Sequence, residues 1–345
     1  MVEARWLVFP FLLALTACVS TLKTIPNAWL SVPASQPGQQ RRTADGPIRI
    51  ADAFTGPKLA NGDKVLTEPF AAIDSFDYSE SRGEVAFSAR RNGGFDIGLV
   101  SSEGSPISWI PADPADEVAV QWAPRGNKIS YVLRLPGGDV IRTLHVPTAA
   151  SLAVPFDGAA VHGVTWDDAA ERFSVSYSTL DASPRVEVMK YSGAERKVVE
   201  PPAVTLDVEL ETVAPGAVLL RPRDLKYDEK LPLVLWSATD LSWSDARAAL
   251  LKNARVAVVV VTREPGDALS RAVKNIPWVD SGRVFAVGTC VEGALCITTD
   301  PSLPPGRYRR GGRTVAVAPA VVQSFAAGFI ADELKRTGPT NGSSR

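Results

Sequence analysis

Few side chains in this 345-residue sequence could carry out nucleophilic chemistry, and their types limit the available reactions. The chain has three cysteines, Cys18, Cys290 and Cys296, and two histidines, His145 and His162. So few His and Cys residues argue against a zinc site, and the cysteines are too few for a disulfide framework. A mechanism that needs a histidine base has only two positions from which to take it.

Cys290 is the residue best placed to act as a nucleophile. It lies in the segment Gly-Thr-Cys-Val-Glu (288–292), directly after an apolar run at 284–287 that predicts a buried strand. Hydrolase nucleophiles often occupy a strained strand-to-helix turn with the pattern Gly-x-Ser-x-Gly. Cysteine stands here at the serine position and Glu292 at the second glycine, where its carboxylate would raise the pKa of the thiol. The alternative is that Cys290 is a small buried hydrophobe, with Cys296 further along the same helix and in the core.

The other members of a hydrolase triad are missing after Cys290. None of the 55 residues that follow it is a histidine. The only aspartates there are Asp300, which precedes a proline and predicts a turn, and Asp332, which predicts a solvated helix position. Both histidines lie in the first half of the chain, so a histidine could reach Cys290 only across a domain boundary. No cofactor or metal site is expected, since the sequence has no phosphate-binding glycine loop, EF-hand or HExxH motif.

The N-terminus predicts export and a second use of cysteine chemistry. An apolar run of twelve residues, Trp6–Ala17, follows Arg5 and ends in small residues, which is typical of a secretory signal and too short for a mature membrane span of ~20 residues. Leu-Thr-Ala-Cys (15–18) resembles the lipobox of bacterial lipoproteins, which implies that Cys18 is acylated and becomes the first mature residue. A plain signal with a chance cysteine is the alternative. Val19, in place of an aspartate, favours the outer membrane, with the protein facing the periplasm.

A 44-residue repeat organises the first half. Tyr78, Trp122 and Trp166 are 44 residues apart, and each is followed seven residues later by an apolar residue of the next strand. Both segments alternate with period two, and a third and a fourth strand can be found after them. Four short strands in about 44 residues are typical of a β-propeller blade. Residues 48–72 could supply strands of a fourth blade, but three clear blades leave open whether a ring closes.

These blades resemble those of TolB-like proteins and of the propeller in prolyl oligopeptidase-type peptidases. The second half extends the latter resemblance. It has strand patterns at 206–211, 217–222, 231–236, 256–261, 284–287 and 314–318, with helical patterns at 245–251 and 325–335. Strands that alternate with helices predict a parallel sheet. The order is similar to the α/β-hydrolase domain of the prolyl oligopeptidase family, which implies a nucleophile at Cys290. The turn after 231–236 is Ser-Ala-Thr-Asp (237–240), which lacks the glycines that the family uses to bind an oxyanion.

We therefore expect a multi-domain protein with β-propeller-like antiparallel blades and a truncated α/β-hydrolase-like parallel sheet. The expected parts are a signal peptide (1–17), a lipidated cysteine and flexible tether (18–47), blades (48–201), the hydrolase-like domain (202–336) and a disordered tail (337–345). Near-neutral charge, 37 basic against 38 acidic residues, argues against nucleic acid as a partner.

Loss of the serine, the oxyanion glycines and the downstream histidine together predicts a non-catalytic binding or scaffold module. Its expected partners are the membrane, through Cys18, and an envelope protein. A hydrolase that uses Cys290 is the rival hypothesis. The arginines at 307, 309, 310 and 313 form a basic stretch, interpreted either as a mobile solvated loop or as a surface for anions such as lipid headgroups.

Overall fold

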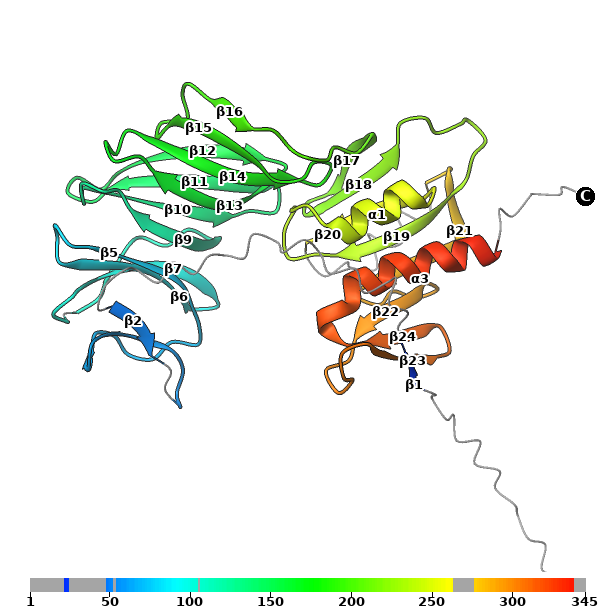
Figure 1. Ribbon diagram of the computed structural model, residues 1–345, viewed down its shortest axis with the longest axis horizontal. Helices are drawn as coiled ribbons and strands as arrows, with labels where there is room; N and C mark the ends of the chain where they lie inside the picture. Colours follow the sequence, from blue (N-terminus) through cyan, green and yellow to red (C-terminus); the bar gives the residue numbers. More distant parts are fainter. Residues whose placement is uncertain (1–21, 25–47, 52–53, 105, 263–275, 338–345) are drawn as a thin grey trace, which may run out of the picture.

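The computed structural model describes residues 22–24, 48–51, 54–104, 106–262 and 276–337. In these residues the chain forms two halves that lie end to end along the long axis (Figure 1). The first half consists of separate antiparallel sheets, and the second is a nine-stranded mixed sheet with two α-helices packed on it. The expected blade-like antiparallel sheets are present, and the sheet that was expected to be parallel is mixed, with antiparallel strands at both edges. No helix in the described residues is long and apolar enough to cross a membrane.

Each copy of the predicted repeat forms one four-stranded antiparallel sheet, in which neighbours in sequence are neighbours in space. The strands are β5 (Ile73–Ser79), β6 (Glu84–Arg91), β7 (Gly94–Ser101) and β8 (Ser108–Trp109); β9 (Asp116–Trp122), β10 (Lys128–Arg134), β11 (Gly138–His145) and β12 (Ala150–Asp157); and β13 (Ala159–Trp166), β14 (Arg172–Thr179), β15 (Arg185–Lys190) and β16 (Lys197–Glu200). Tyr78, Trp122 and Trp166 all lie at the ends of first strands, which accounts for their equal spacing.

A smaller sheet precedes the three blades. It contains β2 (Ile48–Ala51), β3 (Lys58–Asn61) and β4 (Lys64–Val65), so residues 48–72 do supply strands as expected. Figure 1 shows this sheet at one end of the series and β13–β16 at the other, with the remaining blades between them. The first and last sheets of the described series are therefore apart, and these four sheets form an open stack.

Side chains of one blade satisfy the backbone of the next. β9 pairs with β10 along one edge only, which leaves N–H groups on its other edge without a strand partner. The carboxylate of Asp74 accepts a hydrogen bond from the N–H of Ala119 (2.9 Å), and that of Asp77 accepts one from Trp122 (2.8 Å). Polar side chains on the first strand of one blade thus bind the backbone of the first strand of the next blade, about one repeat further along the sequence.

The second half is organised by one sheet with the order β1-β23-β24-β22-β21-β19-β20-β18-β17. Five central strands, β24, β22, β21, β19 and β20, run parallel, and the flanking strands are antiparallel. The strand bounds are β1 (Leu22–Thr24), β17 (Val208–Ala214), β18 (Ala217–Pro222), β19 (Leu231–Ser237), β20 (Ala257–Val261), β21 (Val279–Val287), β22 (Leu295–Thr299), β23 (Arg307–Gly311) and β24 (Thr314–Val317).

Two helices cover one face of this sheet, α1 (Asp245–Asn253) and α3 (Val322–Thr337), the latter preceded by the 3₁₀ turn η2 (Pro319–Val321). The Ser244 hydroxyl caps α1 by accepting from the N–H of Arg247. Trp236 of β19 and Phe325 of α3, both fully buried, are central to the core between sheet and helices. Both faces of β20 are buried, which explains its almost pure valine sequence.

Three sequence-based expectations were wrong in this half. Residues 295–299 form strand β22 and not the helix expected after Cys290, because the β-branched run Ile297-Thr298-Thr299 fills the gap in the sheet between β21 and β24. The arginine-rich stretch is strand β23 of a hairpin and not a mobile loop. Residues 22–24, expected within the flexible tether, pair with β23 as strand β1. The signal peptide and the rest of the tether and tail lie outside the described residues.

Candidate functional site

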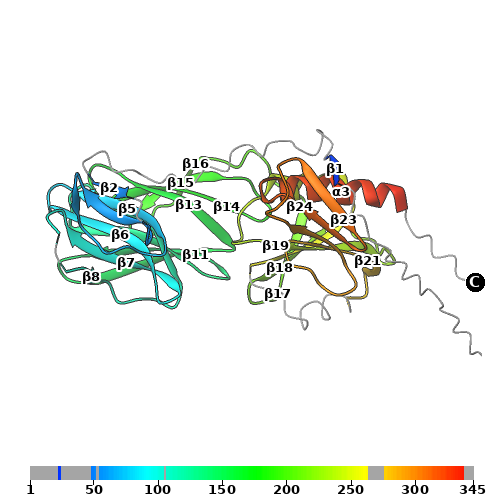
Figure 2. The same ribbon diagram turned by 90° about the horizontal axis from the view of Figure 1, so that it is seen from below.

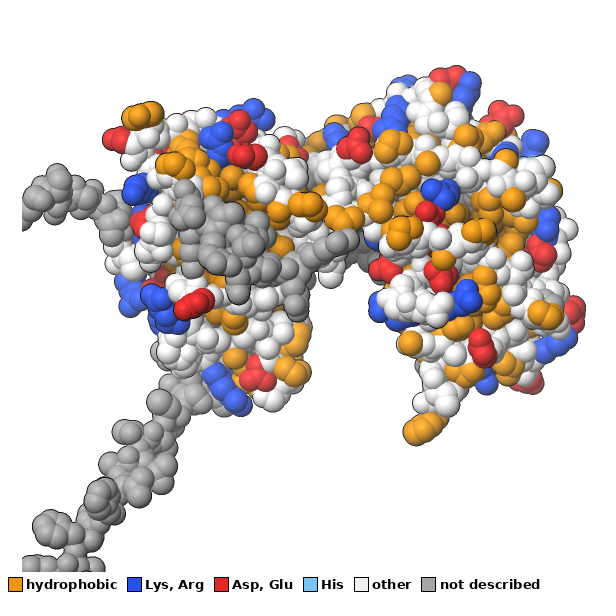
Figure 3. Space-filling view, turned by 180° about the vertical axis from the view of Figure 1, so that it is seen from behind, with side chains coloured by type: hydrophobic (Ala, Val, Ile, Leu, Met, Phe, Trp, Pro, Cys, Tyr) orange, Lys and Arg blue, Asp and Glu red, His pale blue; other side chains and the backbone are white. Residues whose placement is uncertain are grey.

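A cleft of about 200 Å³ lies where the blades meet the carboxyl ends of β19 and β20. Thr239 and Asp240, which follow β19, line one side. Arg134 and Asp139, from the turn region between β10 and β11, line the other. Ligands of open α/β sheets bind outside the carboxyl ends of the strands, so this cleft occupies the position where such a fold places its site. Figure 3 shows the hollow between the two halves from behind.

Charged groups dominate the cleft. Asp139 pairs with Arg134 and also accepts a hydrogen bond from the N–H of Val161 (2.6 Å). Burial raises the pKa of Asp139 to about 6, although Arg134 and the Val161 N–H act in the opposite direction. Asp240 accepts from the N–H of Ser242 (2.9 Å), which fixes the turn after β19. Carboxylates from both halves therefore face one gap, and they suit a partner that donates hydrogen bonds.

A buried arginine lies beneath this turn. Arg247 of α1 is 1% exposed, and its Nη2 donates to the carbonyl of Ser242 (2.6 Å). Burial lowers the pKa of Arg247 to about 10, and the nearby negative charge of Asp240 opposes that change. The cation thus holds the turn after β19 in place.

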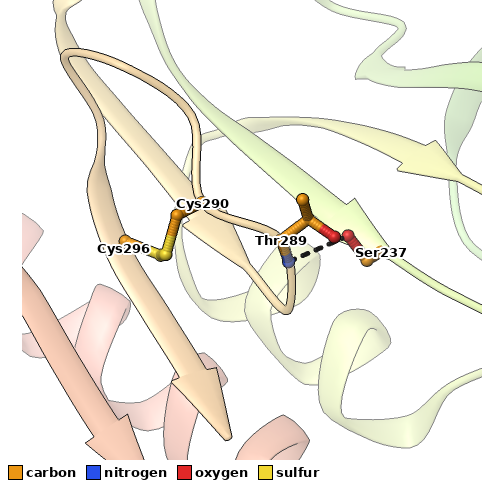
Figure 4. Close-up of a disulfide and its surroundings, with 4 residues drawn as sticks. All are labelled: Ser237, Thr289, Cys290 and Cys296. Carbon is orange, nitrogen blue, oxygen red and sulfur yellow. Dashed lines mark hydrogen bonds between the residues drawn. A yellow bond between two sulfur atoms is a disulfide. The ribbon is translucent and has the colours of Figure 1, made fainter. Parts of the chain in front are cut away.

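The segment predicted to carry a nucleophile is closed by a disulfide. Cys290 is bonded to Cys296 across six residues, and Figure 4 shows the bond joining the loop after β21 to strand β22. Cys290 is exposed and Cys296 is 3% exposed. The interpretation of Cys290 as a small buried hydrophobe is therefore wrong, as is the expectation that the two cysteines share a helix. A sulfur in a disulfide has no thiolate to attack a substrate.

The backbone groups nearby are also occupied. Gly288 has φ +91°, and a Cβ there would lie 2.8 Å from the Cβ of Ser237, so glycine is required for the loop to pass β19. The N–H of Thr289 donates to the Ser237 hydroxyl (3.2 Å; Figure 4), and the N–H of Ala238 donates to the carbonyl of Val261 (2.9 Å). Neither N–H points into open space as an oxyanion donor must.

The two histidines are bound within the blades. His145 Nδ1 lies 2.8 Å from the Thr148 hydroxyl in the same blade. His162 Nε2 lies 2.7 Å from Ser178 Oγ, and that oxygen accepts a hydrogen bond from the N–H of Trp243 in the second half (2.9 Å). Burial lowers the pKa of His162, with Asp240 opposing. His162 thus reaches the boundary between the halves, where it takes part in a contact through Ser178.

Sequence reasoning did not find Arg134, Asp139 or Ser178. All three lie on strands or turns whose local pattern is ordinary for a blade, so no signal marked them. The disulfide did have a signal, because Glu292 and Gly293 between the cysteines favour a turn that brings residues 290 and 296 together. Asp300 accepts from the hydroxyl of Ser302 in a turn, and Asp332 lies 3.9 Å from Lys335 on α3, so both predicted settings are confirmed.

No protein-family model and no curated protein matches this sequence. Solved structures do resemble it. One, from a structural and mechanistic study of two prolyl endopeptidases, has a TM-score of 0.53 at 11% identity over 71% of this chain. Porphyromonas gingivalis dipeptidyl peptidase 4 has a TM-score of 0.53 at 13% identity over 71%, and a putative dipeptidyl aminopeptidase IV from Bacteroides ovatus has 0.51 at 10% over 70%.

The chain has a partial prolyl oligopeptidase-like fold. It spans 45% of the first two chains and 48% of the third, less than half of each. At these identities the likeness concerns the fold alone.

Proposed function

We propose that this protein is a lipid-anchored component of the bacterial cell envelope that binds a partner protein in the cleft between its blades and its hydrolase-like sheet, without hydrolysing it. The anchor would be an acylated Cys18, and the expected location is the periplasmic face of the outer membrane. The proposal treats the prolyl oligopeptidase-like fold as a scaffold from which the catalytic groups have been lost.

The observation that carries the non-catalytic part is the Cys290–Cys296 disulfide. It removes the one candidate nucleophile, and strand β22 stands where a helix with an N-terminus able to stabilise a thiolate was expected. The Thr289 and Ala238 N–H groups also support a non-catalytic role, because both already donate hydrogen bonds within the protein. The disulfide also supports export, because such bonds persist in oxidising compartments and are rare in the cytosol.

The cleft supports the binding part. Its residues come from both halves, and Leu135 at its rim is 40% exposed, so an incoming side chain has an apolar contact in the same cleft as the carboxylate of Asp240. A polar, hydrogen-bond-donating segment of an envelope protein fits this combination.

The rival, a hydrolase that uses Cys290, can be tested directly. Purified protein is offered peptide and ester chromogenic substrates, and iodoacetamide is added before and after reduction. We expect no turnover and labelling of Cys290 only after reduction. Cys296→Ala is the informative control because it frees the Cys290 thiol. Turnover in the wild type or in Cys296→Ala that Cys290→Ala abolishes would overturn the non-catalytic proposal.

Partner binding is tested with a photo-crosslinking amino acid at Leu135 in cells. The matched control is Leu152, which is 46% exposed on β12 and does not line the cleft. We expect one discrete crosslinked envelope protein from position 135 and none from 152. The same crosslinks from both positions, or none from either, would contradict a partner in the cleft. Mass spectrometry of the N-terminal peptide tests acylation of Cys18.

A further inference from the structure

Strand β1 fixes where the chain approaches the membrane. It pairs antiparallel with β23, with Leu22 opposite Arg309 and Thr24 opposite Arg307. The N-terminal end of β1 therefore points along β23 toward the turn of the β23–β24 hairpin, at Gly312 and Arg313. Cys18 precedes Leu22 by four residues, a length of chain that reaches at most about 14 Å when extended. An acyl group on Cys18 would hold this turn close to the lipid surface.

Basic side chains gather at this same end, which we call the basic end and define as Arg310, Arg313, Lys335 and Arg336. Arg313 is exposed in the hairpin turn, and its Nη1 donates to the carbonyl of Gly293 (2.9 Å). The last turn of α3 adds Lys335 and Arg336, whose side chains are 74% and 69% exposed. Figure 3 shows Lys and Arg side chains along the end of this half that faces away from the blades.

Two carboxylates accompany these cations. Glu333 binds Arg310 Nη2 (3.0 Å) and Arg336 Nε (2.9 Å). Asp332 lies 3.9 Å from Lys335 Nζ. Glu292 is a third acid near this end, exposed beside the Gly293 whose carbonyl binds Arg313, so the basic end keeps an excess of cations. The hairpin from 307 to 317 contains four arginines and no acidic residue. A surface of this composition attracts anionic headgroups, at about 1 kcal/mol per basic residue near the membrane.

The basic end and the cleft lie at opposite ends of the sheet. β22 and β24 run parallel to β19 and β20, and they begin beside the hairpin turn, where Cys296 is opposite Thr314. β19 and β20 end at the cleft, which Thr239 and Thr262 line. Contact between the basic end and the membrane would therefore direct the cleft and the blades away from the lipid.

We infer that the basic end docks on anionic phospholipid headgroups, so that β1 and these cations together set the orientation of the cleft. The inference rests on the proposed acylation of Cys18 for its membrane, and on the β1–β23 pairing and the basic end for its geometry. Lipid is the occupant favoured here because only four residues separate the proposed acylation site, Cys18, from Leu22, and β1 points toward the hairpin turn that carries Arg313.

Arginine modification in vesicles tests the inference. The mature lipidated protein is reconstituted in phosphatidylcholine vesicles with or without about 30% phosphatidylglycerol. Phenylglyoxal adducts are then quantified by mass spectrometry. We expect modification of Arg313 and Arg336 to slow about three-fold or more in the anionic vesicles, and high salt to remove the difference. Arg125, exposed in a blade turn, is the internal control and is expected to react equally in both.

A variant that lacks three of the cations, and a second way to anchor the protein, distinguish a failure of the docking inference from a failure of the lipoprotein proposal. In R313Q/K335Q/R336Q, the remaining Arg310 is expected to react equally in both vesicles, whereas R125Q keeps the wild-type ratio. If Cys18 carries no acyl group, the chain from residue 19 is held on nickel-chelating lipid through an N-terminal histidine tag. Protection that persists there supports the docking surface although the lipoprotein proposal has failed. Equal modification of Arg313 in both vesicles, with either anchor, overturns the docking inference alone.

Discussion

The two halves of this protein join their neighbouring elements in different ways, although both have apolar cores. In the blades, polar side chains of one first strand bind the backbone of the next, as Asp74 and Asp77 do with Ala119 and Trp122. In the second half, a single sheet is buried under two helices and held by apolar packing around Trp236 and Phe325. The contacts between blades join residues that are about one repeat apart in the sequence. The contacts within the sheet join strands that are not neighbours in the sequence.

The difference also separates the sequence-based predictions that were right from those that were wrong. A blade is a repeated unit whose polar contacts recur, so its sequence remains recognisable as a repeat. The hydrolase-like sheet can omit a helix and remain a sheet, provided that another strand fills the place. Strand β22 and the Cys290–Cys296 bond do this, and the nucleophile position becomes a structural crosslink.

The largest expected effects come from truncating the two cores. Phe325→Ala should destabilise the sheet half by about 3–5 kcal/mol, because a fully buried ring is lost from its contacts with Tyr308 and Phe329. Phe173→Ala should destabilise the blades by a similar amount. Hydrogen exchange followed by mass spectrometry measures each half, and each variant should raise exchange mainly in its own half. If either substitution unfolds both halves together, the two halves do not have independent cores.

Loss of the disulfide should have the next largest effect. Cys290→Ser/Cys296→Ser opens a small loop, and loop-closure entropy gives a loss of about 2 kcal/mol in the unfolding free energy of the sheet half. Denaturant unfolding of the variant and of reduced wild type should agree, and exchange in the blades should be unchanged. A variant as stable as the oxidised wild type would mean that β22 is held by its strand pairing alone.

A pH effect should be confined to the blades. Burial raises the pKa of Glu117 from 4.5 to about 7, so its folded state binds a proton more tightly than the unfolded state. Its contribution is fully present below pH 4.5 and is lost as pH rises toward 7. Glu117→Gln should flatten this slope in unfolding curves measured from pH 4.5 to 8. A slope unchanged in the variant would assign the titration to another group.

The smallest expected effect concerns the contact between the halves. Ser178→Ala removes the acceptor of the Trp243 N–H and the partner of His162, at a cost of about 1 kcal/mol. Ser176→Ala on the same strand is the matched control, since that residue is not fully buried. The measurement is the exchange rate of peptides that contain Trp243, which should rise only in Ser178→Ala. Equal rates in the two variants would show that the contact does not couple the halves.

Much of the fold could be predicted from residues close in sequence. The equal spacing of Tyr78, Trp122 and Trp166 gave the three blades, and the apolar run at 256–261 gave the central strand β20. The segment after Gly288 could not be predicted in this way, because a family pattern favoured a helix while the vacancy in the sheet favoured a strand. The cleft could not be predicted either, since Asp240 is far in sequence from Arg134 and Asp139.

The sequence by itself determined the periods, the buried strands, the missing histidine and the scarcity of nucleophiles, because these follow from local pattern and composition. Only the tertiary structure decided that Cys290 is bonded to Cys296, that His162 contacts Ser178, and that β1 joins the sheet edge at β23. Each of these depends on the pairing of segments that local pattern leaves free. Which segments pair depends on which strand edges and which spaces in the core are still open once the rest of the chain has folded.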